Sequence, residues 1–325
     1  MDKTFYVSFT VAACAALVSN MGEAIGQGYP TQPIRFIVPY AAGGGVDLIA
    51  RAVAPRLSEK LGQPVVIDNR GGAGGNIGTE VAARSEPNGY TLVMGAAALA
   101  INVSLYRKLP FDPVKDFAPI SLIAATPNIL AVHAVVPAKS VKELIHLAKT
   151  KPGGLNYASA GNGTTSHLAG ELLKTMAGID IVHVPYKGTS PAVVALLSGE
   201  AAIMLAPALT LLAHMKANRV RGLAVTGAKR SPAIPTLPTV AESGVPGFEA
   251  RQWYGVLAPA GTPKEIVTRL NGEVVKIVQS AEVTNRLLRE GSEPIGSTAD
   301  EFGRYIKAEI AKWAKVVQVS GARVD

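Results

Sequence analysis

Short apolar runs alternate with longer amphipathic segments through the first part of the chain. The apolar runs are rich in β-branched residues and lie at residues 34–40, 64–69 and 90–96. Each is followed by a segment whose apolar positions have helical spacing, at residues 46–62, 76–85 and 98–109. A short buried strand followed by an amphipathic helix, repeated along the chain, is typical of βαβ units and a largely parallel sheet.

The same alternation begins again in the middle of the chain. Strand-like runs lie at residues 128–133, 155–160, 181–186, 201–206 and 220–226. Helical segments follow at residues 140–153, 165–178, 190–199 and 208–219, and residues 263–324 read as a helical tail. The pattern therefore predicts a second α/β domain built like the first.

Two long apolar runs, residues 118–132 and 248–259, are β-like and are interpreted as hinges between the domains. The chain crosses between the domains twice, so its C-terminal segment returns to the first domain. We therefore expect residues 28–127 and 249–325 to form one domain and residues 128–248 the other. Two-domain α/β proteins of this kind bind ligands in the cleft, where strand ends and helix N-termini face each other.

The N-terminus predicts export. One lysine precedes an apolar run over residues 4–19, so residues 1–27 are interpreted as a cleavable signal peptide. A membrane-anchoring helix and a lipid anchor at Cys14 are the less favoured alternatives, the second because the apolar run continues past Cys14 to Val18. No later stretch reaches the roughly 18 apolar residues of a membrane span. The expected location is the periplasm.

Composition removes several function classes. Cys14 is the only cysteine among 325 residues, so a mature chain without it has no disulfide and no thiolate site. The net charge is +8, but lysines and arginines are scattered, which argues against nucleic acid and allows a general attraction for anions. The five histidines form no metal-ligand pattern, and no GxSxG motif is present.

Four glycine-rich or small-residue turns connect expected strands to expected helices, at residues 39–47, 69–78, 95–100 and 159–167. Glycine lets the backbone approach a ligand, and the unpaired amides of a helix start favour an anion. A dinucleotide motif is absent because Ile77 stands where the third glycine belongs, and there is no GxxxxGK[ST] loop. Anion binding is therefore predicted without a nucleotide cofactor, although plain tight turns remain an alternative.

Asp47 stands in the first turn of the helix that follows the first glycine-rich turn. An acid is stabilised there by the helix dipole. If an anion also binds at this turn, Asp47 should point away or pair with a cation or an amide. Farther along, Lys187 and Tyr186 follow another strand and could add a positive charge and a hydroxyl, although a solvated lysine is an equal alternative.

Taken together, these segments resemble the Bug (Bordetella uptake gene) family, the TctC-like substrate-binding proteins of tripartite tricarboxylate transporters. The matching stretches cover the expected mature chain in order, at residues 29–51, 61–83, 87–95, 109–124, 156–174, 184–192 and 301–317. The resemblance implies a type II periplasmic binding protein fold with two Rossmann-like α/β domains. It also implies a monomer without enzymatic activity, cofactor or metal.

The function that the resemblance implies is capture of a small carboxylate by hinge closure, followed by delivery to the membrane permease subunits of the transporter. A ligand-presenting partner of a sensor receptor is the alternative, and an enzyme on a binding-protein scaffold is a third reading. In the first domain the implied ligand-binding residues are Tyr40, Gly43, Gly44, Gly45, Gly95, Ala96 and Ala97. In the second they are Ser159, Ala160, Gly161, Thr164, Thr165, His167, Tyr186, Lys187, Gly188, Ala206 and Pro207.

The chain departs from the family pattern at three places. Gly71 replaces a common proline, residues 96–98 are three alanines where hydroxyl residues are common, and residues 205–207 lack a common aspartate. The last two changes make the expected pocket more apolar. The hypothesis is a carboxylate with an apolar or aromatic body rather than citrate or an amino acid.

Overall fold

The computed structural model describes residues 28–232 and 234–324. The expected signal peptide and Cys14 lie outside the described residues. Among the residues that are described, no helix has the length and apolar character needed to cross a membrane.

The described strands form one ten-stranded sheet in the order β2-β1-β3-β9-β4-β7-β5-β6, and β8 and β10 both pair with β4. The strands are β1 (Ile34–Val38), β2 (Val65–Asn69), β3 (Thr91–Ala96), β4 (Phe117–His133), β5 (Asn156–Ser159), β6 (Val182–Pro185), β7 (Ile203–Pro207), β8 (Val220–Val225), β9 (Arg251–Pro259) and β10 (Glu293–Pro294).

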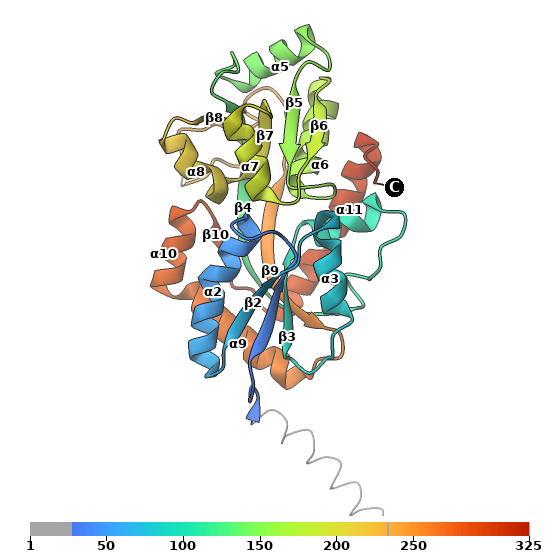
Figure 1. Ribbon diagram of the computed structural model, residues 1–325, viewed down its shortest axis with the longest axis vertical. Coiled ribbons are helices and arrows are strands. Elements are labelled where there is room, and N and C mark those ends of the chain that lie inside the picture. The colour runs from blue at the N-terminus through green and yellow to red at the C-terminus, as the bar shows by residue number, and fades with distance from the viewer. Residues whose placement is uncertain (1–27, 233, 325) are drawn as a thin grey trace, which may run out of the picture.

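Helices cover this sheet and divide into two groups (Figure 1). The helices are α2 (Gly45–Leu61), α3 (Asn76–Ala83), α4 (Ala98–Leu105), α5 (Val141–Thr150), α6 (Thr165–Ala177), α7 (Thr189–Ser198), α8 (Ala208–Lys216), α9 (Lys264–Gln279), α10 (Ala281–Arg289) and α11 (Ala299–Ser320), with a short 3-10 helix η1 (Ala73–Gly75). We call β1–β3 with α2, α3, α4, α9 and α10 the lower lobe, and β5–β8 with α5–α8 the upper lobe.

The sheet is mixed, which corrects the expectation of a largely parallel one. Strands within each lobe are parallel, since β1 pairs with β2 and β3, and β5 pairs with β6 and β7. By contrast β4 runs antiparallel to β7, β8, β9 and β10, and β3 runs antiparallel to β9. The reason is that β4 carries the chain from the lower to the upper lobe and β9 carries it back.

The two long apolar runs are these connecting strands. Along β4, residues Phe117–Pro127 pair with β9, and from Asn128 onward the partners are β7 and β8. The tail is not wholly helical, because β10 interrupts it and pairs with β4 at residues 124–125. Helix α11 then packs on β4, α4 and α6, and its Glu309 accepts hydrogen bonds from the buried indoles of Trp253 and Trp313.

Candidate functional site

Five helices begin at one small cavity between the lobes, which we call the inner cavity. Val46 of α2 and Ala98 of α4 line it from the lower lobe. Thr165 of α6, Thr189 of α7 and Pro207, the N-cap of α8, line it from the upper lobe. The first amides of a helix have no intrahelical acceptor and carry the positive end of the helix dipole. Their convergence creates a positive potential without a charged side chain.

No acidic or basic side chain from the described part of the chain lines the inner cavity. Its volume is ≈ 20 Å³, whereas a neighbouring outer cavity has ≈ 410 Å³. Tyr40 and Ala160 line both cavities, so the two are adjacent. The outer cavity is bordered mainly by residues 71–75 of the lower lobe and 185–188 of the upper lobe. Among the residues that the structure describes, Lys187 is the one charged residue in its lining.

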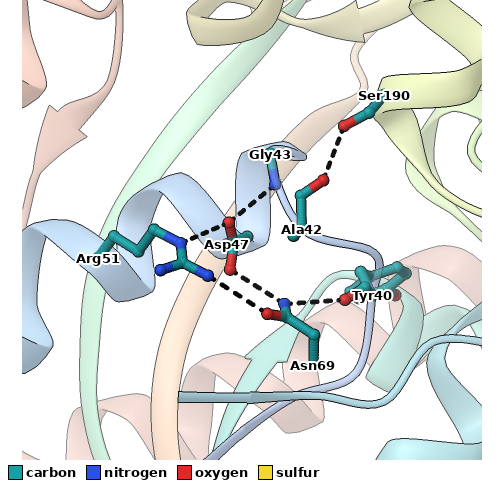
Figure 2. Close-up of polar contacts among 7 residues, drawn as sticks. All are labelled: Tyr40, Ala42, Gly43, Asp47, Arg51, Asn69 and Ser190. Atoms are coloured by element: carbon teal, nitrogen blue, oxygen red, sulfur yellow. Dashed lines mark hydrogen bonds and ion pairs between the residues drawn. The ribbon is translucent and has the colours of Figure 1, made fainter. Parts of the chain in front are cut away.

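The loop before α2 is held by a buried carboxylate (Figure 2). Asp47 Oδ2 accepts hydrogen bonds from the Gly43 amide and from Arg51 Nε, both at 2.8 Å. Asp47 Oδ1 accepts from Asn69 Nδ2 at 2.9 Å, and the same amide donates to the Tyr40 carbonyl oxygen at 3.1 Å. Asp47 therefore pairs with one cation and two amides. A pairing of this kind was expected from the sequence if an anion binds at this turn. The Gly43 amide is consequently already occupied.

Burial acts on Asp47 in one direction and its partners act in the other. The residue is 1% exposed, and desolvation by itself would raise the pKa of its carboxyl. Hydrogen bonds from Arg51, Gly43 and Asn69 outweigh desolvation, so the pKa of Asp47 lies below its ordinary value. The carboxylate is therefore ionised at neutral pH and fixes the first turn of α2.

Hydroxyl groups shape the loop before α6. The amide of Ala160 donates to Ser166 Oγ at 2.9 Å, and Thr164 Oγ1 donates to the Gly161 carbonyl oxygen at 2.6 Å. Thr165 Oγ1 donates to Gln252 Oε1 on β9. These bonds close the loop on itself and tie it to a connecting strand, so the amides at the start of α6 are held at the cavity.

Two stacked histidines lie behind this loop. The rings of His167 and His183 are 4.2 Å apart, and His183 also stacks on Tyr157 at 4.9 Å. His167 Nδ1 accepts from the Gly163 amide at 3.3 Å, and His183 Nε2 lies 2.6 Å from Ser159 Oγ. Desolvation, assisted by nearby positive charge, lowers the pKa of His167 to about 4 and that of His183 to about 3. Both rings are neutral near pH 7 and support the loop.

The histidine pair predicts a loss of stability in mild acid. Below pH about 6.5 both histidines take up protons in the unfolded chain but remain neutral in the fold, so the unfolded state binds more protons. The free energy of unfolding should therefore fall as the pH is lowered from 6.5 to 4.5, by up to about 1.4 kcal/mol per pH unit for each histidine. Denaturant titrations at several pH values measure this slope. His183→Phe, which preserves stacking, should roughly halve it, and a flat wild-type profile would contradict the assignment.

The lobes touch directly around the cavities. Ser190 Oγ of α7 donates to the Ala42 carbonyl oxygen at 3.0 Å, as Figure 2 shows. A Cβ atom at Gly74 would lie 2.1 Å from the Asn162 carbonyl oxygen, and one at Gly163 would lie 2.0 Å from Asn102 Oδ1. Because glycine has no side chain, the backbone of one lobe can approach the other lobe closely at these two positions.

The structure brings together many of the residues that the resemblance implied. The inner cavity is lined by Tyr40, Ala160, Thr164, Thr165 and Pro207. The outer cavity is lined by Tyr40, Ala160, Gly161, Tyr186, Lys187 and Gly188. The Tyr186 hydroxyl, expected as a possible ligand donor, donates instead to Glu200 Oε1 at 2.8 Å.

Other implied residues line neither cavity. Gly44 lies against Thr189, and Gly45 lies against Pro207 and the Tyr254 hydroxyl, so they shape the edge of the site. Ser159 and His167 support the loop from behind. The rest, for which a ligand contact stays a prediction, are Gly43, Gly95, Ala96, Ala97 and Ala206.

Sequence reasoning missed part of the lining. The inner cavity also contains Asn128 and Gln252, which come from the connecting strands β4 and β9. A signal for the first existed, because Asn128 is the only amide side chain in the apolar run 118–132. The glycine-rich turn at residues 69–78 was recognised, but its place at the outer cavity was not. The lining residues missed there are Gly71, Gly72, Ala73, Gly74, Gly75, Tyr106, Asn162, Pro185 and Val324.

Comparison of the sequence with known families gives a match over residues 49–322 to the Tripartite tricarboxylate transporter family receptor, TctC. Protein BugT of Bordetella pertussis (strain Tohama I) is 38% identical over 298 residues, which cover 91% of this chain and 91% of BugT.

Solved structures of similar proteins cover almost the whole chain. R. palustris Rpa4515 with adipate is 41% identical, with a TM-score of 0.89 over 91% of this chain and 100% of that one. The periplasmic binding protein BugD is 34% identical, with a TM-score of 0.87 over 91% and 99%. MatC from Rhodopseudomonas palustris with bound malate is 32% identical, with a TM-score of 0.85 over 89% and 100%. The fold is therefore that of periplasmic binding proteins, as expected.

Proposed function

Because this chain belongs to the family of tripartite tricarboxylate transporter receptors, we propose that it is a periplasmic solute-binding protein that captures a small carboxylate. The family consists of binding receptors rather than enzymes. Two solved relatives hold dicarboxylates, adipate in Rpa4515 and malate in MatC, which supports an acid as the ligand of this chain.

The observation that carries the proposal is the convergence of five helix starts on the inner cavity. Oriented amides and helix dipoles stabilise a carboxylate there without a lysine or arginine in the lining. Thr164 and Thr165 line the same place, but their hydroxyls donate to Gly161 and Gln252, so the backbone amides are the donors for the carboxylate. Asp47, the acid in the first turn of α2, is neutralised by Arg51 and does not oppose a bound anion.

The body of the ligand is proposed to be apolar. The cavity lining at the start of α4 is Ala98, and that at the end of β7 is Pro207, so neither offers a side-chain donor. The carboxylate would occupy the inner cavity, and the remainder would extend past Tyr40 and Ala160 into the outer cavity. The binding of adipate, an acid with an apolar chain, by the 41% identical Rpa4515 supports this arrangement.

Hinge closure is proposed to couple capture to transport. Residues 28–127 with 249–325 would move against residues 128–248 about β4 and β9, and a ligand touching both would favour the closed state. The contacts between Ser190 and Ala42 and between Gly74 and Asn162 would then exist only when the lobes are closed. The closed form would deliver its ligand to the permease. Pull-down from membranes distinguishes a permease from a sensor receptor as the partner.

A panel of acids tests the proposal by thermal unfolding. Adipate or benzoate present at about 100 times its Kd should stabilise the protein by about 2.7 kcal/mol. For a protein of this size that corresponds to roughly 5–10 °C in Tm. Hexane-1,6-diol, which has the chain of adipate without its charges, is the control and should give no shift. If no acid raised the Tm, the binding proposal would be wrong. If citrate and aspartate bound tightly and both apolar acids did not, only the apolar body would be wrong.

A further inference from the structure

One side chain in the inner cavity has unsatisfied hydrogen-bonding capacity in both directions. Asn128 is fully buried, yet neither its Nδ2 nor its Oδ1 has a hydrogen-bond partner among the residues that the structure describes. The result does not depend on which way the amide is turned, because both atoms are unpaired. Burying a polar group without a partner is costly, so a ligand that supplies hydrogen-bond partners for this amide would be stabilised in the cavity.

The neighbouring polar side chains already have hydrogen-bond partners within the protein. Gln252 Oε1 accepts from Thr165 Oγ1, and Thr164 Oγ1 donates to Gly161. Asn128 lies on the connecting strand β4, at the residue where the partners of that strand change from β9 to β7 and β8. It therefore faces the cavity from the place where the lobes join.

The backbone of Asn128 is joined to the second connection through Thr226. The Asn128 amide donates to Thr226 Oγ1 at 2.9 Å, and the Thr226 amide donates to the Asn128 carbonyl oxygen at 2.8 Å. Thr226 Oγ1 in turn donates to the carbonyl oxygen of Ala250, the residue before β9. One buried hydroxyl thus holds both crossings together beside the cavity. A ligand that contacts the Asn128 side chain therefore contacts a residue that lies on β4 and is joined through Thr226 to the start of β9.

We infer that Asn128 is the specificity-determining residue of the site, binding the carboxylate head through Nδ2 and an O–H donor beside it through Oδ1. The inference rests on the proposed function. A carboxylate only accepts hydrogen bonds at neutral pH, so it satisfies Nδ2 but not Oδ1. The donor is either a hydroxyl next to the carboxylate, as in malate, or a water held against the head of an acid such as adipate.

Asn128→Leu tests this inference, since leucine has a similar size and no hydrogen-bonding groups. Calorimetric titration with adipate and with malate should show affinity reduced by about 10–150-fold for whichever acid the wild type binds. A larger loss for malate than for adipate assigns the donor to the ligand hydroxyl, and equal losses assign it to water. Asn128→Asp places an acceptor against the carboxylate and should abolish binding of both acids.

Asn271→Leu is the matched control. Asn271 is not part of the cavity lining, and its side-chain amide donates to the carbonyl oxygens of Ile120 and Ser297. That variant should lower the Tm without ligand and leave the affinity unchanged. Asn128→Leu should do the opposite, because it removes two unpaired groups: the Tm without ligand should stay level or rise.

The outcomes separate the two proposals. If Asn128→Leu lowers the Tm as Asn271→Leu does, or keeps its affinity within about threefold, which is less than one lost hydrogen bond, the inference is overturned. If the wild type binds no acid, the proposed function fails, and the Tm of Asn128→Leu alone decides whether Asn128 has a structural role. A level or raised Tm then still supports Asn128 as a contact for some ligand.

Discussion

Replacing Gly74 by alanine should weaken ligand binding by about 5–150-fold while leaving the fold intact. The new Cβ would lie 2.1 Å from the Asn162 carbonyl oxygen across the cleft. This oxygen belongs to the backbone and cannot rotate away as a side chain would, so the lobes must stay more than an ångström further apart. Overpacking of this kind costs about 1–3 kcal/mol, which corresponds to a rise in Kd of about 5–150-fold.

Gly62→Ala provides a closely matched control for this variant. Gly62 has φ +69° and ψ +12°, close to the φ +64° and ψ +19° of Gly74, and a Cβ there meets nothing within 4 Å. Both variants bear the same backbone strain, about 1 kcal/mol. Calorimetry on both should show reduced affinity for Gly74→Ala alone. Equal affinities in the two variants would show that the lobes do not close through this contact.

Replacing Asp47 by asparagine should lower the free energy of unfolding by about 2–4 kcal/mol, because a buried and hydrogen-bonded charge is removed from its partners. Asparagine cannot accept from the Gly43 amide, Arg51 and Asn69 at once, because one of its side-chain atoms is a donor. Urea titration at pH 7 measures the loss.

Asp68→Asn is the control, since Asp68 also pairs with two arginines, Arg35 and Arg70, but its side chain is 29% exposed. The Asp68→Asn substitution should lower the free energy of unfolding by less than about 1 kcal/mol.

The lowered pKa of Asp47 adds a pH test. Its stabilisation is complete above the unfolded pKa of about 4 and is lost as the pH falls through the lower folded value. The stability of Asp47→Asn should lack this part of the dependence on acid pH. Equal losses of unfolding free energy in Asp47→Asn and Asp68→Asn would contradict the stabilising role of the Asp47 hydrogen bonds.

The strands and helices were largely predictable because hydrophobic periodicity reports burial directly. Helix α2, expected over residues 46–62, spans Gly45–Leu61, and α6, expected over 165–178, spans Thr165–Ala177. The direction of the connecting strands was not predictable, because an apolar run is equally compatible with parallel and antiparallel neighbours. Strand β10 escaped notice because two residues carry no periodicity.

The site was predictable where one local segment produced it. The turn before α2 and the loop before α6 were recognised by their glycines and hydroxyls, and Asp47 was expected to need a partner. Two of its partners, Gly43 and Arg51, are four residues away, but Asn69 was identified only by the fold because it lies 22 residues away on β2. The placement of Ser159 and His167 behind the loop likewise depends on His183 of a neighbouring strand, which is hydrogen-bonded to Ser159 and stacks on His167.

By itself the sequence determined that helix starts rich in glycine and hydroxyl residues would favour an anion, because capping and dipole effects act within one turn of the chain. Only the tertiary structure decided that five helix starts meet at one cavity, that Asn128 faces it with an unpaired amide, and that Gly74 and Asn162 touch across the cleft. These relations join residues far apart in sequence. They arise from how β4 and β9 set one lobe against the other, which no local pattern encodes.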